Sequence, residues 1–232
     1  FGLSVLNIVS PYNGFEPHAK RFFEVAYDKD EISQVLPFEE LHTYNDICDM
    51  FLTGSDQIWN YNPNKKDKRY DGYFRLDFVA EEKRKVSFGT SLGKYIPPTE
   101  EDFLKFQKLY SRYNAISLRE QEGVEIFKKF YGIEVERVME PVLCVQNECW
   151  HKIAEYSTYE EKEPYLLTYI LDPTPEKREA IEYYGKKLGI KVINILDGFS
   201  GIYERNKKTL NLPNTLPNIW CGDFLKYYMN AY

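Results

Sequence analysis

The sequence has few histidines and cysteines, and neither residue type forms a recognisable motif. The three histidines, His18, His42 and His151, have no Ser or Cys partner at a motif spacing, which argues against a hydrolase triad. The four cysteines show no C-x-x-C pattern, so the sequence predicts no metal site. Scattered cysteines in a chain of this length are typical of buried thiols in a reducing compartment.

Basic clusters and long apolar runs are also lacking. The chain has 30 Lys and Arg against 36 Asp and Glu, with a net charge of -6 and no basic stripe. Phosphate backbones are bound by clustered positive charge, so nucleic acid is not expected as the main partner. No apolar run approaches the roughly 20 residues that span a bilayer, and no signal peptide is recognisable. We expect a cytoplasmic protein, with the inner face of the membrane as an alternative location.

Strand-like and helix-like patterns alternate along the chain. Apolar runs such as "DICDMFLTG", "KRKVSFGTSLG" and "NAISLRE" are followed by helical patterns such as "EEDFLKFQKLYSRY" and "QEGVEIFKKFYG". After the charged stretch "STYEEKE" the alternation restarts with "PYLLTYIL" and "IKVINIL". This order predicts an α/β fold of two Rossmann-like domains, 1–156 and 164–232, each with a mainly parallel sheet and helices on both faces.

Polar residues follow three of the predicted strands, in "GSDQ", "SLG" and "SLRE". Because ligands bind outside the carboxyl ends of parallel strands, these residues are expected to meet at one edge of a sheet. Plain explanations exist for two of these stretches: Ser55 or Asp56 caps a following helix, and Arg119 forms a surface pair with Glu120 or Glu122. The alternative for Arg119 is that its guanidinium clamps a phosphate or a carboxylate.

Taken together, these stretches resemble the polysaccharide pyruvyl transferases. The resemblance covers roughly residues 20 to 232 and is carried by "GSDQIWN", "YFRLDFV", "KRKVSFGTSLG" and "ISLRE". Glu140 and Val142 stand where the family usually has Asp and Thr, which argues against a role for that turn. The family's Ser-Phe-His-Gly motif, with its catalytic histidine, would follow Tyr232. We therefore expect a piece of a longer protein whose second domain is incomplete.

The resemblance implies transfer of the carboxyvinyl unit of phosphoenolpyruvate onto two hydroxyls of a sugar or lipid-linked saccharide, giving a cyclic ketal. It also implies a fold similar to B-type glycosyltransferases, with neither cofactor nor metal. Arg119 would be the catalytic cation and the missing histidine the proton donor.

Further residues would bind the substrates in this interpretation. Neutral hydrogen bonds would come from Ser55, Gln57, Asn60 and Ser91, while Asp56 would orient a hydroxyl or Arg119. Glu120 is also expected to be one of the substrate-binding residues. Two other functions stay open: a sugar-nucleotide glycosyltransferase on a similar fold, and a non-catalytic sugar-binding or assembly protein.

Overall fold

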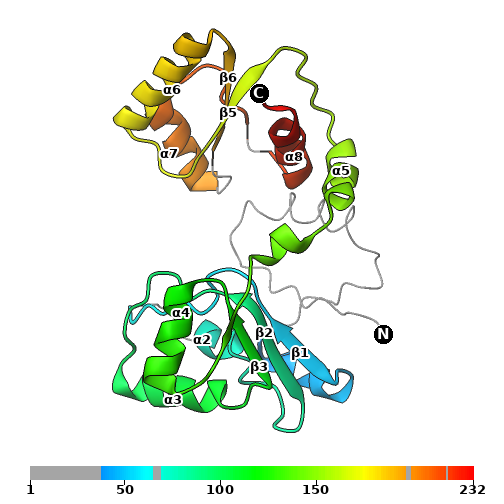
Figure 1. Ribbon diagram of the computed structural model, residues 1–232, viewed down its shortest axis with the longest axis vertical. Helices are drawn as coiled ribbons and strands as arrows, with labels where there is room; N and C mark the ends of the chain where they lie inside the picture. The colour runs from blue at the N-terminus through cyan, green and yellow to red at the C-terminus, as the bar shows by residue number, and fades with distance from the viewer. Residues whose placement is uncertain (1–37, 65–68, 197–199, 218) are drawn as a thin grey trace. The chain divides into compact units, whose positions relative to one another are not determined.

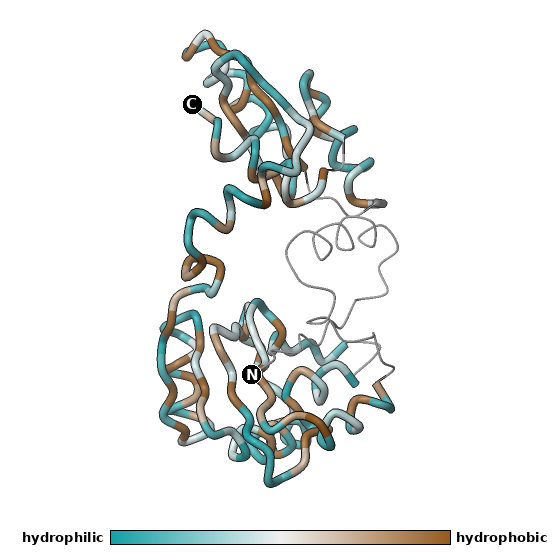
Figure 2. Tube along the Cα trace, turned by 90° about the vertical axis from the view of Figure 1, so that its right-hand side faces the viewer, coloured by the Kyte–Doolittle hydropathy of each residue, from teal (hydrophilic) through white to brown (hydrophobic). Residues whose placement is uncertain are grey.

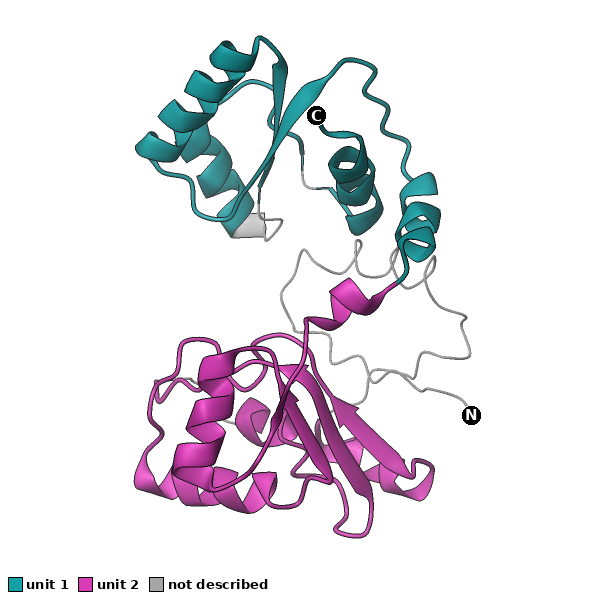
Figure 3. Ribbon diagram, viewed as in Figure 1, with its two compact units in different colours: residues 1–35, 146–232 teal, residues 36–145 magenta. Residues whose placement is uncertain are grey.

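The computed structural model describes residues 38–64, 69–196, 200–217 and 219–232. The chain divides into two compact units, residues 36–145 as unit 2 and residues 1–35 with 146–232 as unit 1 (Figure 3). Each unit is described here by itself. The beginning of the predicted first domain falls on residues 1–37 and lies outside the described residues.

Unit 2 is built on a four-stranded parallel sheet (Figure 1). Its strands are β1 (Met50–Thr53), β2 (Arg84–Thr90), β3 (Ala115–Leu118) and β4 (Glu136–Arg137), and they are neighbours in that order. The apolar runs of the sequence predict the first three strands, and the fourth strand is only two residues long. Parallel pairing places all four carboxyl ends at the same edge of the sheet.

Helices connect the strands of unit 2. A 3-10 helix, η2 (Phe38–Asp46), precedes β1, and α2 (Arg69–Tyr73) and α3 (Glu100–Tyr110) lie on either side of β2 in sequence. Thr99 caps α3, since its hydroxyl accepts a hydrogen bond from the Asp102 amide at 3.2 Å. After β3, α4 (Gln121–Ile126) continues as a π turn, η3 (Phe127–Tyr131), and ends at Gly132 with φ +66°.

The helices of unit 2 cover one face of its sheet. Ile116 and Leu118 of β3 are buried in a hydrophobic cluster that includes Phe106 of α3 and Phe127 of η3. On the other face, Met50, Leu52 and Phe88 are exposed among the described residues. The expectation of helices on both faces is therefore wrong for the described part of unit 2. Successive strands are added in one direction, and right-handed crossovers then place every connecting helix on the same side.

An aromatic cluster around a buried arginine fills the core of unit 2. Trp59, the aromatic residue of "GSDQIWN", is buried and donates from its indole nitrogen to the Phe74 carbonyl at 2.8 Å. The Arg75 guanidinium donates to the Trp59 carbonyl at 3.0 Å and to the Tyr110 hydroxyl at 2.8 Å. It also lies over the Phe106 ring, 3.9 Å from the centroid. Trp59 therefore anchors the polar loop that carries the candidate site.

A register shift separates the two halves of the β2–β3 pairing. Ser87 pairs with Ile116 and Thr90 with Leu118, so β2 holds one more residue than β3 over this stretch. The Ser117 hydroxyl fills the gap in the ladder: it donates to the Ser87 carbonyl at 2.9 Å and accepts from the Gly89 amide at 3.2 Å. Past the shift, the Thr90 carbonyl accepts the Arg119 amide hydrogen at 3.1 Å.

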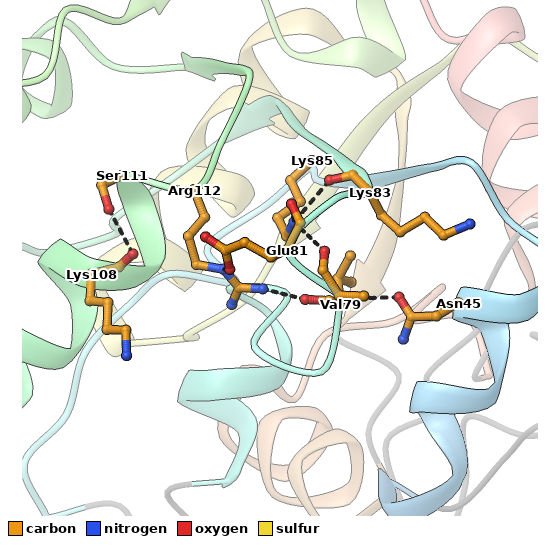
Figure 4. Close-up of polar contacts among 9 residues, drawn as sticks. Asn45, Val79, Glu81, Lys83, Lys85, Lys108, Ser111 and Arg112 are labelled. Atoms are coloured by element: carbon orange, nitrogen blue, oxygen red, sulfur yellow. Dashed lines mark hydrogen bonds and ion pairs between the residues drawn. The ribbon is translucent and has the colours of Figure 1, made fainter.

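A buried lysine organises the amino edge of the same sheet. The Lys85 side chain is fully buried, and its ammonium donates to three main-chain carbonyl oxygens, those of Ala80 at 2.6 Å, Lys83 at 2.9 Å and Glu81 at 3.3 Å (Figure 4). Arg112 ties the same loop by pairing with Glu81 at 2.9 Å and donating to the Val79 carbonyl. Burial lowers the pKa of Lys85.

Unit 1 has a two-stranded parallel sheet, β5 (Tyr165–Ile170) and β6 (Lys191–Leu196), with helices on both faces (Figure 1). Tyr165, Ile193 and Ile195 pack with Tyr227 of α8 (Cys221–Asn230). Side chains of α6 (Pro175–Leu188) and α7 (Ser200–Leu210) form a second cluster with Leu196. Residues 193–196 of β6 are all buried, as expected for a strand covered on both faces. Figure 2 shows the hydropathy of the residues along the trace.

Helix α5 (Asn147–Glu155) belongs to unit 1, because it packs against α8. The division by contacts thus lies between Val145 and Gln146. The boundaries 1–156 and 164–232, and the Rossmann-like character of both domains, stay predictions. The structure establishes a mixed α/β chain with parallel sheets.

Candidate functional site

The carboxyl ends of the unit 2 strands meet through main-chain and side-chain contacts. The Asp56 carbonyl, just past β1, accepts the Ser91 amide hydrogen at 2.9 Å, and Asp56 forms an isolated parallel bridge with Thr90. The Arg119 amide donates to the Thr90 carbonyl at 3.1 Å. The expectation that these three strand ends share one edge is confirmed.

Arg119 is the centre of this edge. Its Nε lies 2.9 Å from a Glu120 carboxylate oxygen, its Nη1 contacts Glu140, and its Nη2 lies 3.6 Å from Asp56. The pair with Glu120, offered above as a plain explanation, is therefore real, but it is one of three. Hydrogen bonds from Arg119 to Glu140 and Glu120 raise the pKa of Arg119. A guanidinium that is always charged is thus held at the strand ends.

Glu140 is the residue that sequence reasoning missed. One of its carboxylate oxygens accepts the Ser55 hydroxyl at 2.6 Å and the other contacts Arg119. The doubt about a role for this turn has to be revised, because Glu140 contacts Arg119 and connects the segments that follow β1 and β3. A role for Glu140 in substrate binding stays a prediction. Partial burial would raise the pKa of Glu140, but hydrogen bonds from Ser55 and Arg119, with the Arg119 charge, hold it below its ordinary value. A signal was available: the carboxylate is preserved where the resemblance expects Asp.

Two glycines bring the turns of this site close together. A Cβ on Gly89 would lie 2.7 Å from the ring of Pro141, so glycine lets the Glu140–Pro141 turn pack onto β2. A Cβ on Gly54 would lie 2.1 Å from the Phe88 carbonyl oxygen, and Gly54 has φ +140°. The backbone around Ser55 and Glu140 therefore depends on glycine at both positions.

The remaining predicted site residues lie in the neighbouring loops. Gln57 and Asn60 pack over Gly93, and the Asn60 amide nitrogen lies 3.5 Å from the Gln57 side-chain oxygen. Ser91 is buried, and its hydroxyl accepts the Gly93 amide hydrogen at 2.9 Å, which closes the turn after β2. Roles for these residues in substrate binding stay predictions.

The alternative role of Ser55 and Asp56 as helix caps is wrong. The residues that follow them form a bridge and turns, and no helix begins between Ser55 and Asn64. Asp56 also has φ +70°, whereas a helix-capping residue takes an extended conformation. The polar residues of "GSDQIWN" thus lie in an irregular loop at the sheet edge.

Two further features of the described residues concern metal binding and membrane insertion. No group of three or more His, Cys, Asp or Glu side chains in this part of the chain is placed to hold a metal ion. Among the same residues, no helix combines the length and the apolar character needed to cross a membrane.

A family model of polysaccharide pyruvyl transferases matches residues 6–227, nearly the whole chain. The chain belongs to the polysaccharide pyruvyl transferase family. Searches among curated proteins and among solved structures gave no significant match. The match includes Arg119 and the residues that contact it directly or through Glu140, which are Ser55, Asp56, Glu120 and Glu140. We call these five residues the Arg119 cluster. The Arg119 cluster therefore lies within the residues that match the transferase family.

Proposed function

We propose that the chain transfers the pyruvyl group of phosphoenolpyruvate to a sugar of a surface polysaccharide or its precursor and forms a cyclic ketal. The observation that carries the proposal is the family match over residues 6–227. It is supported by a permanently charged guanidinium at the carboxyl edge of a parallel sheet, where small ligands bind in such folds.

The chemistry makes clear what this edge would supply. Protonation of the methylene carbon of phosphoenolpyruvate makes the neighbouring carbon electrophilic, and a sugar hydroxyl attacks it. The C–O bond to phosphate then breaks, and a second hydroxyl adds to the same carbon and closes the ketal. Negative charge grows on the departing phosphate, so a cation fixed beside its oxygens lowers the barrier. Arg119 is the residue that fits this role.

The acceptor would be a sugar or a lipid-linked saccharide with two hydroxyls close enough to form one ring. Gln57 and Asn60 lie together beside Gly93, with Gln57 exposed and Asn60 half-buried. Amide side chains donate and accept hydrogen bonds, which suits hydroxyl groups. We assign them to the acceptor side of the reaction, and Arg119 to the donor side.

The proposal is tested with the intact protein, phosphoenolpyruvate and saccharides that carry neighbouring hydroxyls. Release of inorganic phosphate should accompany a new ketal methyl signal in proton NMR spectra. Arg119→Met removes the charge but keeps an unbranched side chain, and should lower turnover by about 100- to 1000-fold. Glu122→Gln, on the same segment, serves as the matched control.

Two outcomes would contradict the proposed reaction, and a third would contradict the role assigned to Arg119. Turnover of a nucleotide sugar without any consumption of phosphoenolpyruvate would favour a glycosyltransferase. Saccharide binding with no turnover of either donor would favour a non-catalytic protein. Unchanged turnover in Arg119→Met would remove Arg119 from the site.

A further inference from the structure

The three partners of Arg119 are not equivalent. Each uses a different guanidinium nitrogen: Nε faces Glu120 at 2.9 Å, Nη1 contacts Glu140, and Nη2 faces Asp56 at 3.6 Å. Glu120 and Glu140 lie at hydrogen-bonding distance. The separation from Asp56 exceeds that of a hydrogen bond. The Nη2 edge is thus the most weakly held side of Arg119.

Glu140 is a fixed anchor. Its side chain is 23% exposed, and each of its two oxygens has a partner, Ser55 and Arg119. The turn that carries it packs onto Gly89 through Pro141. Releasing Glu140 from Arg119 would leave a half-buried carboxylate with a single hydrogen bond, which is unfavourable.

Asp56 is an exchangeable partner. Its side chain is 81% exposed, and exposed ion pairs contribute little to stability. Its main chain, in contrast, is held by the hydrogen bond from Ser91 and the bridge to Thr90. The Asp56 carboxylate can therefore turn into solvent without any movement of the backbone.

We propose that the Nη2 edge of Arg119 is the anion subsite of the donor, and that Asp56 is the counter-ion displaced when the donor binds. This inference rests on the proposed function, which supplies an anionic donor. Three carboxylates around one guanidinium leave a local excess of negative charge, which opposes the approach of a phosphate. Displacement of Asp56 removes the carboxylate nearest to Nη2, while Glu120 and Glu140 keep the guanidinium oriented.

This role of Asp56 differs from that of a group that binds a hydroxyl. A hydroxyl-binding carboxylate helps the substrate, so its loss weakens binding. A displaced counter-ion competes with the substrate, so its loss strengthens binding. The sign of the change on Asp56→Asn, which keeps the size of the side chain, separates the two.

The experiment measures the affinity of the intact protein for inorganic phosphate, and the KM for phosphoenolpyruvate, at low ionic strength. Asp56→Asn should tighten phosphate binding by about three- to tenfold, since one charge near the subsite is lost. Glu122→Gln removes a charge from a neighbouring exposed position and should change it by less than about twofold. Glu140→Gln should weaken binding, because Arg119 loses a charged anchor, and Glu140→Asp should restore part of it.

Weaker or unchanged phosphate binding by Asp56→Asn, relative to Glu122→Gln, would overturn the inference. Absence of phosphate binding in all of these proteins would overturn it as well. Because phosphate binding needs no turnover, the two proposals fail separately. Tighter phosphate binding by Asp56→Asn without turnover of phosphoenolpyruvate would support the subsite and contradict the proposed function. Turnover with no effect of Asp56→Asn would contradict the subsite alone.

Discussion

The two edges of the unit 2 sheet each hold a cation, but with partners of different kinds. At the amino edge, Lys85 is fully buried and donates to three main-chain carbonyls (Figure 4). At the carboxyl edge, Arg119 is 26% exposed and faces three carboxylate side chains. Burial lowers the pKa of Lys85, whereas hydrogen bonds to Glu140 and Glu120 raise that of Arg119.

The difference separates a structural cation from one that can bind a ligand. Main-chain carbonyls cannot leave a buried ammonium without a rearrangement of the loop that carries them. A carboxylate side chain on an exposed loop can rotate away and be replaced by a phosphate or carboxylate of a substrate. We therefore assign stability to the amino edge and ligand binding to the carboxyl edge.

The largest effect is expected at the backbone of the carboxyl edge. Gly54→Ala should lower the free energy of unfolding of unit 2 by about 4 kcal/mol or prevent folding, because the new Cβ would meet the Phe88 carbonyl at 2.1 Å. Gly132→Ala is the matched control: Gly132 also has a positive φ, +66°, but nothing lies within 4 Å of its Cβ position. The control should lose only about 1 kcal/mol.

Unfolding can be measured by fluorescence in denaturant, with Trp150 and Trp220 replaced by Phe. Trp59 then reports on unit 2 alone. Equal losses in Gly54→Ala and Gly132→Ala would show that the carboxyl edge is as adaptable in its backbone as in its side chains.

A pair of charge deletions tests the comparison of the two cations directly. Lys85→Met should lower the free energy of unfolding by about 3 kcal/mol, because three carbonyls lose a shared buried donor. Arg119→Met should lower it by about 1 to 2 kcal/mol, because the partly buried Glu140 loses its charged partner, while abolishing phosphate binding. The same fluorescence titration, with phosphate affinity measured in parallel, gives both values. A large loss of stability in Arg119→Met would remove the distinction between the edges.

The smallest effect is the pH dependence of the Glu140 contacts. The pKa of Glu140 is lower in the folded protein than its ordinary value of 4.5, so its stabilisation is complete above that value and is lost as the pH falls through the lowered pKa. Glu140→Gln should be less stable than the unaltered protein by about 1 kcal/mol at pH 7. The difference should shrink as the pH falls below 4.5 and through the lowered pKa of Glu140. A difference that stays constant over an acid titration in which Glu140 becomes protonated would show that charge is not its cause.

Much of the fold follows from the sequence because local signals agree there. The helix starting after Thr99, the glycine that ends the segment at Gly132, and the strands β1, β2 and β3 are encoded by nearby residues. The single covered face of the unit 2 sheet is not encoded locally. It depends on the order in which strands are added, which hydrophobic periodicity does not reveal.

In the candidate site, too, some features follow from local sequence and others depend on the three-dimensional arrangement. Arg119, Ser55 and Asp56 were found because each follows a strand, and parallel strands end at one edge. Glu140 was missed because it lies 21 residues beyond Arg119, after a two-residue strand, and because a change of residue type was interpreted as a loss of role. The buried position of the Ser91 hydroxyl, which closes a turn, also depends on the three-dimensional path of the loop.

The extra residue in β2 has a consequence for the evolution of this chain. Between Ser87 and Thr90 the strand is one residue longer than its neighbour, and only this length delivers the Thr90 carbonyl to the amide of Arg119. A deletion of one residue there would shift the following residues of β2 by one position relative to β3. Side chains that face inward would then face outward, and the reverse. Related proteins that keep the arginine should therefore tolerate insertions and deletions elsewhere in unit 2 before they tolerate one in these four positions.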